Sequence, residues 1–224
     1  MRGRVSIDDY VTEDGSGSLR DAYVRDLLPA SGVPVKLLLI FESPHLEEVA
    51  AGTPVVGGAG QSALAYLLGN ATRGSLGEFV DAMHTAGDYR VAVMNVSNVP
   101  LQPQAFNDDA GPLTPAEWKV IGVVRDSRAR EVDGTMTPEA NRIGTIIRDG
   151  LQGRVSRLKF ESGAAAVLCG DFVQRFARRL TCLPGEPLKV FHPSRNLWLN
   201  NPDRDEHKAL RKLFLASTAP LNQP

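Results

Sequence analysis

Four short apolar runs alternate with helix-like segments along the chain, and this alternation constrains the fold more than any other feature. The runs are KLLLIF (36–41), YRVAVMNV (89–96), AAAVLC (164–169) and PLKVF (187–191). Each is compact, mostly apolar and followed by polar or turn residues, as is typical of strands buried on both faces. Strands that alternate with helices predict a parallel, doubly wound sheet. We therefore expect an α/β protein with a three-layer α/β/α fold and a central, mostly parallel sheet.

The segments between these runs predict helices and two long loops. Apolar spacing predicts helices at 17–28, from about 61 to 70, and at 76–87, 114–127, 137–152, 171–180 and 205–217. A glycine-rich loop is expected at 43–60. A proline-rich, polar loop is expected at 97–115, and loops of that length are usually functional or mobile. We expect one domain over 1–224, with an N-terminal helical extension at 1–33.

Composition excludes several classes of protein. No apolar run approaches the roughly 18 residues of a membrane span, and no apolar segment follows the first arginines as in a secretory signal. Two cysteines, Cys169 and Cys182, suit a cytoplasmic protein with reduced thiols and are too few for a zinc ribbon or a cysteine-ligated cluster. The net charge of −1 gives no global attraction to nucleic acid, although a local basic face would suffice for phosphate contacts. We expect no metal, no cofactor and no membrane contact.

Polar residues gather where three of the predicted strands end. The exits read FESPH (41–45), NVSN (95–98) and HPSRN (192–196). In an open parallel sheet, ligands bind outside the carboxyl ends of the strands. Topology alone therefore predicts a site built by these three loops, with His192 held by the stiff residue Pro193.

Two familiar motifs are poor fits. Gly58, Gly60 and Ala63 match G-x-G-x-x-A, but about seventeen residues separate them from the preceding strand, whereas a dinucleotide fingerprint follows its strand at once. Ser43 and Ser194 are not in a G-x-S-x-G elbow, which counts against a serine hydrolase. Glycines beside a helix N-terminus still expose N–H groups that suit a phosphate.

Five ordered segments resemble the uracil-DNA glycosylase superfamily over roughly residues 35 to 215. FESP (41–44) is similar to the first motif, G-E-A-P-G, of the branch with an iron–sulfur cluster, and TPVVGGAGQSALAYLL (53–68) to that branch's R-P-F-V-G-x-A-G-Q-L-L. MNVSNVP (94–100) resembles T-N-V-V-K-C-R-P-P, and VLCGDFVQRF (167–176) resembles V-x-L-G-x-x-A. HPSRN (192–196) resembles the second catalytic motif, H-P-S-P, and with Asn200 the single-strand-selective form of it.

The chain also departs from the family pattern. Phe41 and His45 replace the two glycines of the first motif, Val55 replaces the aromatic residue that stacks on the base, and Arg195 replaces a proline. The cluster cysteines are absent, so the resemblance implies no iron–sulfur centre here.

The resemblance implies roles for particular residues. His192 would donate to a carbonyl of the leaving base, Asn95 would read the Watson–Crick edge, and Glu42 or Ser43 would orient water or the sugar. The expected groups are catalytic (His192, Glu42, Ser43), base-binding (Asn95, Phe41, Val55, His45), DNA-backbone (Gly60, Gln61, Ser62, Ser194, Arg195) and an intercalating loop (Leu197, Trp198). Packing under the loop is the other interpretation of Trp198.

Three functions follow as hypotheses. The first is a monofunctional DNA glycosylase that releases uracil by base flipping. The second is the same chemistry on another damaged or modified base, including a bulky one in foreign DNA, because Val55 leaves room where a ring would stand. The third is a module of this fold that binds DNA without cleaving it. In each case the expected partner is single- or double-stranded DNA, and a monomer with no obligate protein partner is expected.

Overall fold

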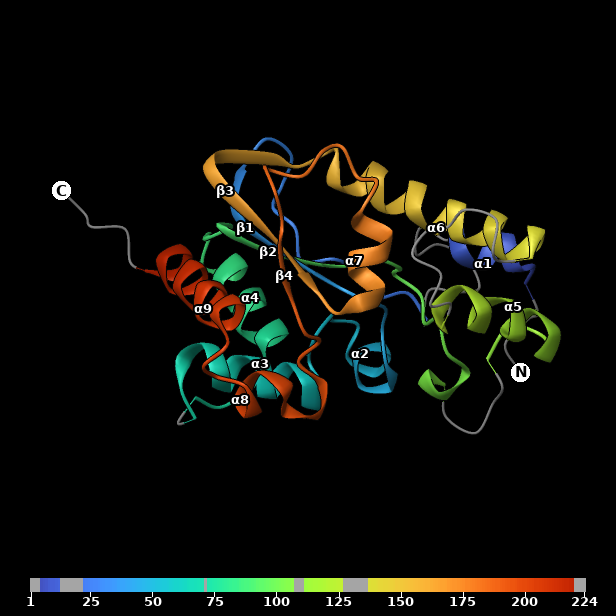
Figure 1. Ribbon diagram of the computed structural model, residues 1–224, viewed down its shortest axis with the longest axis horizontal. Helices are drawn as coiled ribbons and strands as arrows, with labels where there is room; N and C mark the ends of the chain where they lie inside the picture. The colour runs from blue at the N-terminus through green and yellow to red at the C-terminus, as the bar shows by residue number, and fades with distance from the viewer. Residues whose placement is uncertain (1–4, 13–21, 71, 107–110, 127–136, 220–224) are drawn as a thin grey trace.

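A single four-stranded parallel sheet forms the centre of the protein (Figure 1). The computed structural model describes residues 5–12, 22–70, 72–106, 111–126 and 137–219. Within them the sheet has the order β2-β1-β3-β4 and consists of β1 (Pro34–Phe41), β2 (Val91–Asn95), β3 (Lys159–Cys169) and β4 (Leu188–Val190). All three strand pairs are parallel, so the predicted α/β class and parallel sheet are confirmed.

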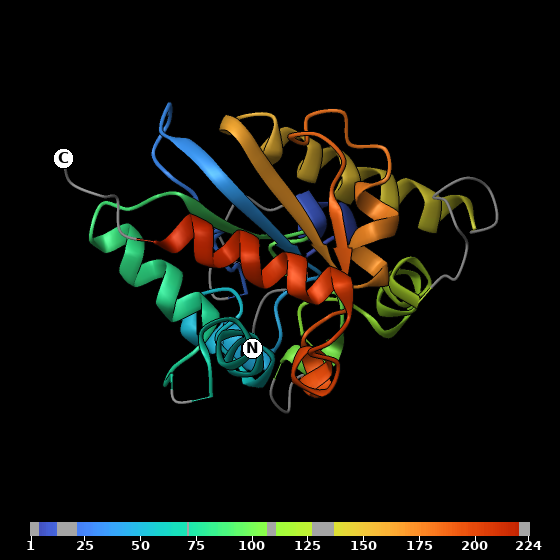
Figure 2. The ribbon, with the colours of Figure 1, turned by 60° about the vertical axis from the view of Figure 1, so that its left-hand side comes forward.

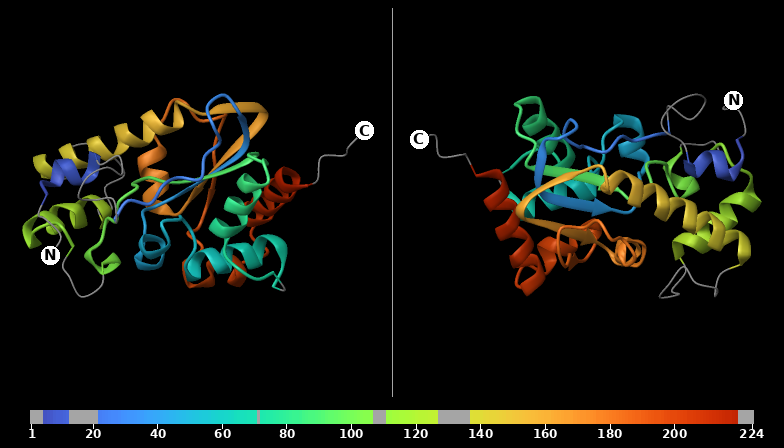
Figure 3. Two further views of the ribbon diagram at one scale, coloured as in Figure 1. Left: turned by 180° about the vertical axis from the view of Figure 1, so that it is seen from behind. Right: turned by 90° about the horizontal axis from the view of Figure 1, so that it is seen from above.

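Helices cover both faces of this sheet (Figures 2 and 3). One face packs against α3 (Gly58–Leu68), α4 (Leu76–Thr85), α8 (Leu197–Asn200) and α9 (Asp205–Thr218). The other packs against α1 (Ile7–Thr12), α5 (Pro115–Asp126), α6 (Pro138–Val155) and α7 (Asp171–Ala177). In Figure 2, α9 crosses in front of the strands while α6 and α7 lie behind them. The short α2 (Leu46–Ala51) lies beside the carboxyl ends of the strands.

The pleat of β1 explains why its sequence is apolar at every position from Leu37 to Phe41. Leu38 and Ile40 face the core under α5, α6 and α7, whereas Leu37, Leu39 and Phe41 face the core under α3 and α9. Successive side chains in a strand point to opposite faces, so a strand covered on both faces buries all of them. This burial is the physical reason that the short apolar runs predicted the strands correctly.

The N-terminal segment is a correction to the expected helix at 17–28. In its described part, residues 22–28, the chain is extended and irregular, and Leu27 forms an antiparallel bridge with Val93 through N···O distances of 2.8 and 3.0 Å. The outer edge of β2 presents unpaired backbone groups, and pairing with the segment satisfies them. Tertiary pairing thus overrides the local helical pattern.

Other boundaries also differ from expectation. A helix, α2, lies inside the region expected to be a glycine-rich loop, α3 begins at Gly58 rather than near Gln61, and β3 begins five residues before the predicted 164. The loop at 97–115 holds a 3₁₀ turn, η2 (Pro103–Ala105), while 107–110 lie outside the described residues.

Cys169 and Cys182 are free cysteines, as expected. No helix in the described ranges is long and apolar enough to cross a membrane.

Candidate functional site

A cavity of about 220 Å³ opens at the carboxyl edge of the sheet. The end of β2, the segment that follows β1 with α2, and the segment that follows β4 meet there with the first turn of α3. The residues that line it are Phe41, Ser43, His45, Glu47, Glu48, Val55, Gly57, Gly58, Ala59, Gly60, Asn95, His192 and Ser194. Eight of these belong to the sites predicted from sequence, so the structure brings most of the predicted groups into one place.

A larger cleft lies elsewhere. It measures about 780 Å³, runs between α7 and β4, and is lined by both acidic and basic side chains. None of the residues expected to carry chemistry lines it. We therefore place the candidate site in the smaller cavity at the strand ends, where parallel sheets bind their ligands.

The register of the sheet sets which side chains meet in the cavity. Phe41 at the end of β1 pairs with Asn95 at the end of β2. From the other side, His192 follows β4 and lies edge-on to the Phe41 ring, with ring centroids 6.2 Å apart. Gly170 directly follows β3 with φ +104°, and a Cβ there would lie 3.1 Å from the Cβ of His192. The absence of a side chain at Gly170 therefore leaves room for His192 beside the end of β3.

The ring of His192 is held in one tautomer. The backbone N–H of Ser194 donates to its Nδ1 at 3.2 Å, so Nδ1 is an acceptor and the proton of the neutral ring lies on Nε2. Burial lowers the pKa of His192 to about 4; the charge of Glu42 opposes this shift, and those of His45 and Arg125 add to it. A neutral imidazole with an Nε2–H can donate to an oxygen that gains negative charge.

Two polar side chains in the cavity wall have unsatisfied atoms. Asn95 is 1% exposed and Ser43 is 4% exposed, and neither Asn95 Oδ1 nor Ser43 Oγ has a hydrogen-bond partner among the described residues. A buried polar atom without a partner costs about 1–3 kcal/mol. A ligand that supplies the missing partners would recover this cost, so these two atoms mark where a polar ligand fits.

Val55 is held in a strained conformation. Its φ is +57°, which is rare for a β-branched residue and costs about 1–3 kcal/mol. Its N–H donates to Glu48 Oε1 at 2.5 Å and its carbonyl accepts from Gly77 N at 3.0 Å. A Cβ on Gly60 would lie 1.8 Å from that carbonyl oxygen, so glycine is required at 60 for α3 to pack here. The surroundings fix Val55 as part of the cavity wall.

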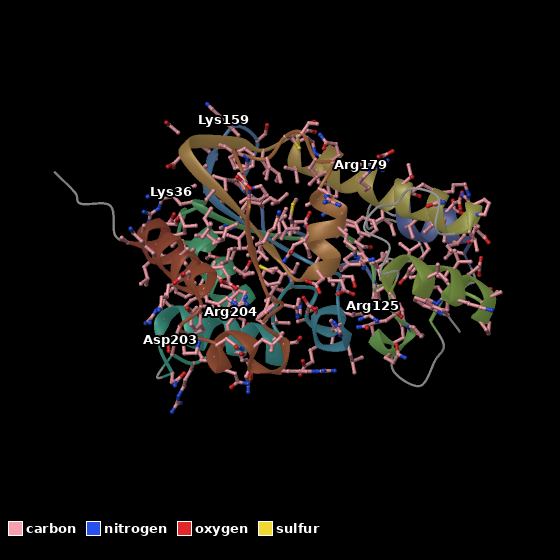
Figure 4. All side chains as sticks on the ribbon, viewed as in Figure 1. Lys36, Arg125, Lys159, Arg179, Asp203 and Arg204 are labelled. Carbon is pink, nitrogen blue, oxygen red and sulfur yellow. The ribbon has the colours of Figure 1, made fainter. Side chains whose placement is uncertain are left out.

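Glu42 lies beside the cavity and does not line it. Its Oε1 is 2.5 Å from Nε of Arg125, the arginine labelled between α2 and α5 in Figure 4. The carbonyl of Arg125 in turn accepts from the guanidinium of Arg175 at 2.7 Å. The predicted catalytic role of Glu42 would therefore require the carboxylate to leave this ion pair or to act through its charge on His192.

The residues expected to hold the DNA backbone separate into two groups. Gly60 and Ser194 line the cavity, Gln61 is exposed on the first turn of α3, and Arg195 is exposed with φ +56°. Ser62 is 5% exposed and lies outside the cavity wall, and its Oγ has no partner in the described part of the chain. The expectation for Ser62 is thus not met in this conformation, because its hydroxyl is buried in the packing of α3.

Trp198 requires a similar correction. Its side chain is fully buried, its Nε1 donates to the carbonyl of Phe191 at 2.7 Å, and its ring lies 6.2 Å from that of Tyr66. The indole thus packs under the loop and presents no surface that could wedge into DNA. Leu197 is half-buried, so it and the exposed Arg195 remain the candidates for that role.

Sequence reasoning missed several cavity residues. Glu47, Glu48 and the glycines at 57 and 58 line it, and Gln102 Nε2 lies 2.6 Å from Nδ1 of His45. The Glu48 carboxylate caps α2 by accepting from the N–H of His45 at 2.8 Å. A glutamate three residues after the N-cap is half of a capping-box signal, but His45 at the N-cap is not one of the residues that usually complete it, so the sequence signal for α2 was weak.

The remaining findings concern metals and relatives. In the ranges that the structure describes, no cluster of three or more His, Cys, Asp or Glu side chains could hold a metal ion.

A scan against models of known protein families and a search of curated proteins both found no match. The likeness to the uracil-DNA glycosylases therefore depends on the sequence segments named above.

Proposed function

We propose that the protein is a monofunctional DNA glycosylase that hydrolyses the N-glycosidic bond of a flipped base, with uracil as its substrate. The observation that carries this proposal is the meeting of Asn95, Ser43 and His192 in one small cavity. The first two supply unsatisfied buried atoms, and the third supplies a neutral Nε2–H donor. A cavity of about 220 Å³ suits a single pyrimidine ring better than a base with a large substituent.

In this mechanism the protein acts mainly on the leaving base. The extruded base enters the cavity with its polar edge at Asn95, and the bond from C1′ to the base nitrogen breaks as the sugar becomes oxocarbenium-like. The electron pair of that bond remains on the base, and His192 Nε2–H donates to the carbonyl oxygen that gains the negative charge. Water then adds to C1′, its proton is released, and the base leaves after protonation.

The direct test measures base release from labelled single- and double-stranded oligonucleotides that contain uracil, with alkali to cut the abasic product. We expect strand breaks at the uracil position only. Release of a modified base with uracil left intact would change the proposed substrate and leave the proposed reaction, hydrolysis of the N-glycosidic bond, unchanged. DNA binding that weakens steeply with salt, without any abasic product, would mean that the protein binds DNA but does not cleave the glycosidic bond.

The binding-only alternative has one specific observation in its favour. The carboxylate of the FESP segment, Glu42, is paired with Arg125 rather than directed into the cavity. A glycosylase that needs this carboxylate to position water would be inactive in such an arrangement. The oligonucleotide assay separates the two functions, since only the enzyme yields abasic sites.

The lowered pKa of His192 leads to a prediction for the pH dependence. An exposed histidine titrates near 6.5, whereas burial lowers the pKa of His192 to about 4. The neutral, donating ring is therefore present throughout the range from neutral to mildly acidic pH. We expect the acid limb of the pH–rate profile for base release to lie near 4. A limb between 6 and 7 would show that the ring is solvated, contrary to the structure.

Glu47 yields a second prediction, on DNA affinity. Its Oε2 accepts from Gly58 N at 3.2 Å, so a carboxylate already lies at the N-terminus of α3, where a backbone phosphate is expected. A phosphate must displace it against like-charge repulsion. We expect Glu47→Gln to tighten binding of a single-stranded oligonucleotide by about fivefold, equivalent to roughly 1 kcal/mol. Fluorescence anisotropy at fixed salt measures this.

The matched control for Glu47→Gln is Asp81→Asn. Asp81 is exposed on α4 and does not line the cavity, so this change removes the same charge elsewhere. Equal tightening in both variants would indicate a general charge effect and would contradict a phosphate position at α3.

A further inference from the structure

His207, on α9, is a buried histidine that the proposed mechanism does not use. It is 0% exposed. Its Nδ1 lies 2.8 Å from the carbonyl oxygen of Asn201, and because a carbonyl can only accept, Nδ1 is the donor. Its other ring nitrogen, Nε2, has no partner among the described residues. The bond to Asn201 therefore attaches the chain just beyond α8 to α9.

The same ring contacts the start of the segment that carries His192. The Phe191 ring lies edge-on to the His207 ring, with centroids 5.7 Å apart. The carbonyl of Phe191 accepts from Trp198 Nε1 at 2.7 Å, and the Trp198 ring lies 6.4 Å from that of His207. His207 thus contacts both ends of residues 191–201, which we call the histidine loop.

Two consecutive residues of the histidine loop have left-handed backbone conformations. Arg195 and Asn196 both have φ +56°. Positive φ is uncommon outside glycine, and it persists only where the surrounding structure enforces it. In the same turn the N–H of Leu197 donates to the carbonyl of Ser194, and the N–H of Ser194 donates to His192 Nδ1 at 3.2 Å. The turn that orients His192 therefore depends on contacts from outside it.

We propose that His207 is a positioning residue that holds both ends of the histidine loop, and so keeps the strained turn in the conformation that directs His192 into the cavity. The bond to Asn201 and the contact with Phe191 act together, because they fix the two ends of the loop against α9. The role of His192 in this inference rests on the proposed function, but the conformation of the loop can be measured without DNA.

The informative variant is His207→Phe. Phenylalanine keeps a buried aromatic ring and removes both the donor to Asn201 and the nitrogen that has no partner, so we expect the fold to be retained. The single-turnover rate constant for uracil release should fall about 100-fold, the usual effect of misplacing a catalytic group by about 1 Å. A merely structural role predicts a smaller fraction of active protein with an unchanged rate constant, and that result would overturn the proposal.

Two further variants test the donor itself. His207→Asn places an amide N–H the same number of bonds from the backbone as Nδ1. It should release uracil about tenfold faster than His207→Phe, the usual contribution of one hydrogen bond. His207→Gln has the same amide one bond further out and should not recover this rate. If His207→Phe does not fold, the two amide variants decide, and equal rate constants for them would contradict the role of the donor.

The matched control is His84→Phe. His84 lies on α4, its Nε2 bonds to the carbonyl of Val91 at 2.8 Å, and it does not line the cavity. The same substitution there should leave the rate constant for uracil release unchanged. A similar loss of rate in both variants would indicate a general effect of removing a buried histidine and would count against the proposal.

The tautomer of His192 provides a readout that needs no reaction. Nitrogen NMR of the free native protein should show Nε2 protonated and Nδ1 as an acceptor, with the signals assigned by comparison with His192→Ala. In His207→Phe we expect both nitrogen shifts to move toward the average of the two tautomers, and in His84→Phe we expect no change. An unchanged His192 ring in His207→Phe would show that His207 does not position it.

Failure of this inference differs from failure of the proposed function. A changed His192 tautomer in His207→Phe, without release of uracil by the native protein, would support the positioning role and remove the glycosylase. Release of uracil by the native protein, with equal rate constants in His207→Phe and His84→Phe, would remove the positioning role and leave the glycosylase.

Discussion

His192→Ala is expected to lower the rate of base release by about 100- to 1000-fold, the usual effect of removing one donor to a developing oxyanion. The ring places Nε2–H in the cavity because Ser194 N–H occupies Nδ1. Alanine keeps the Cβ that lies against Gly170, so the end of β3 should stay packed. Single-turnover assays on uracil-containing oligonucleotides measure the loss.

The control for this variant is His84→Ala. His84 lies on α4 outside the cavity and bonds only to the carbonyl of Val91 within the described hydrogen bonds, at 2.8 Å. It should release base at the native rate at temperatures well below unfolding. Native activity in the His192 variant, with folding confirmed by circular dichroism, would remove His192 from the mechanism.

Arg154→Met is expected to lower the free energy of unfolding by about 3–5 kcal/mol, the usual cost of leaving one member of a buried ion pair alone. Arg154 lies 2.6 Å from Asp26, and their side chains are 14% and 6% exposed. Arg154 also donates to the carbonyl of Val96, and Asp26 accepts from Asn95 N. The pair therefore holds the end of β2, where Asn95 enters the cavity.

Urea unfolding measures the effect, with Arg157→Met as the matched control. Arg157 is exposed just beyond α6, and its loss should change the free energy of unfolding by no more than about 0.5 kcal/mol. Adding Asp26→Asn to Arg154→Met removes the unpaired charge but keeps an acceptor for Asn95 N, so it should recover part of the stability. Equal costs for the two arginine variants would contradict the structure.

Local sequence was sufficient to predict the sheet and the edge at which the candidate site lies. The first run is apolar at every position from 37 to 41 because both faces of the strand are covered there, and few other structures need such a run. Once the strands are parallel, their carboxyl ends share one edge. The polar exits after them, with Ser43, Asn95 and His192, must then lie close together. The parallel arrangement of the strands therefore brings residues that are far apart in the sequence together at one candidate site.

The sequence misled where a segment's conformation depends on distant partners. Residues 22–28 lie extended because the edge of β2 accepts Leu27. The six-residue α2 is too short to be stable alone and forms only in the context of the surrounding structure. The sequence left two interpretations of Trp198 open, an intercalating role and packing under the loop, and the structure shows the packing, with the indole beside Tyr66 and bonded to the carbonyl of Phe191. Burial of this kind follows from packing between elements.

The sequence by itself therefore determined the fold class, the strands and the edge at which Asn95 and His192 meet, because these follow from apolar periodicity and chain order. Only the tertiary structure decided how those groups are oriented. The tautomer of His192 depends on Ser194 N–H, and the direction of the Glu42 carboxylate depends on Arg125. Hydrogen-bond direction is set by partners that folding brings together, and no local pattern encodes it.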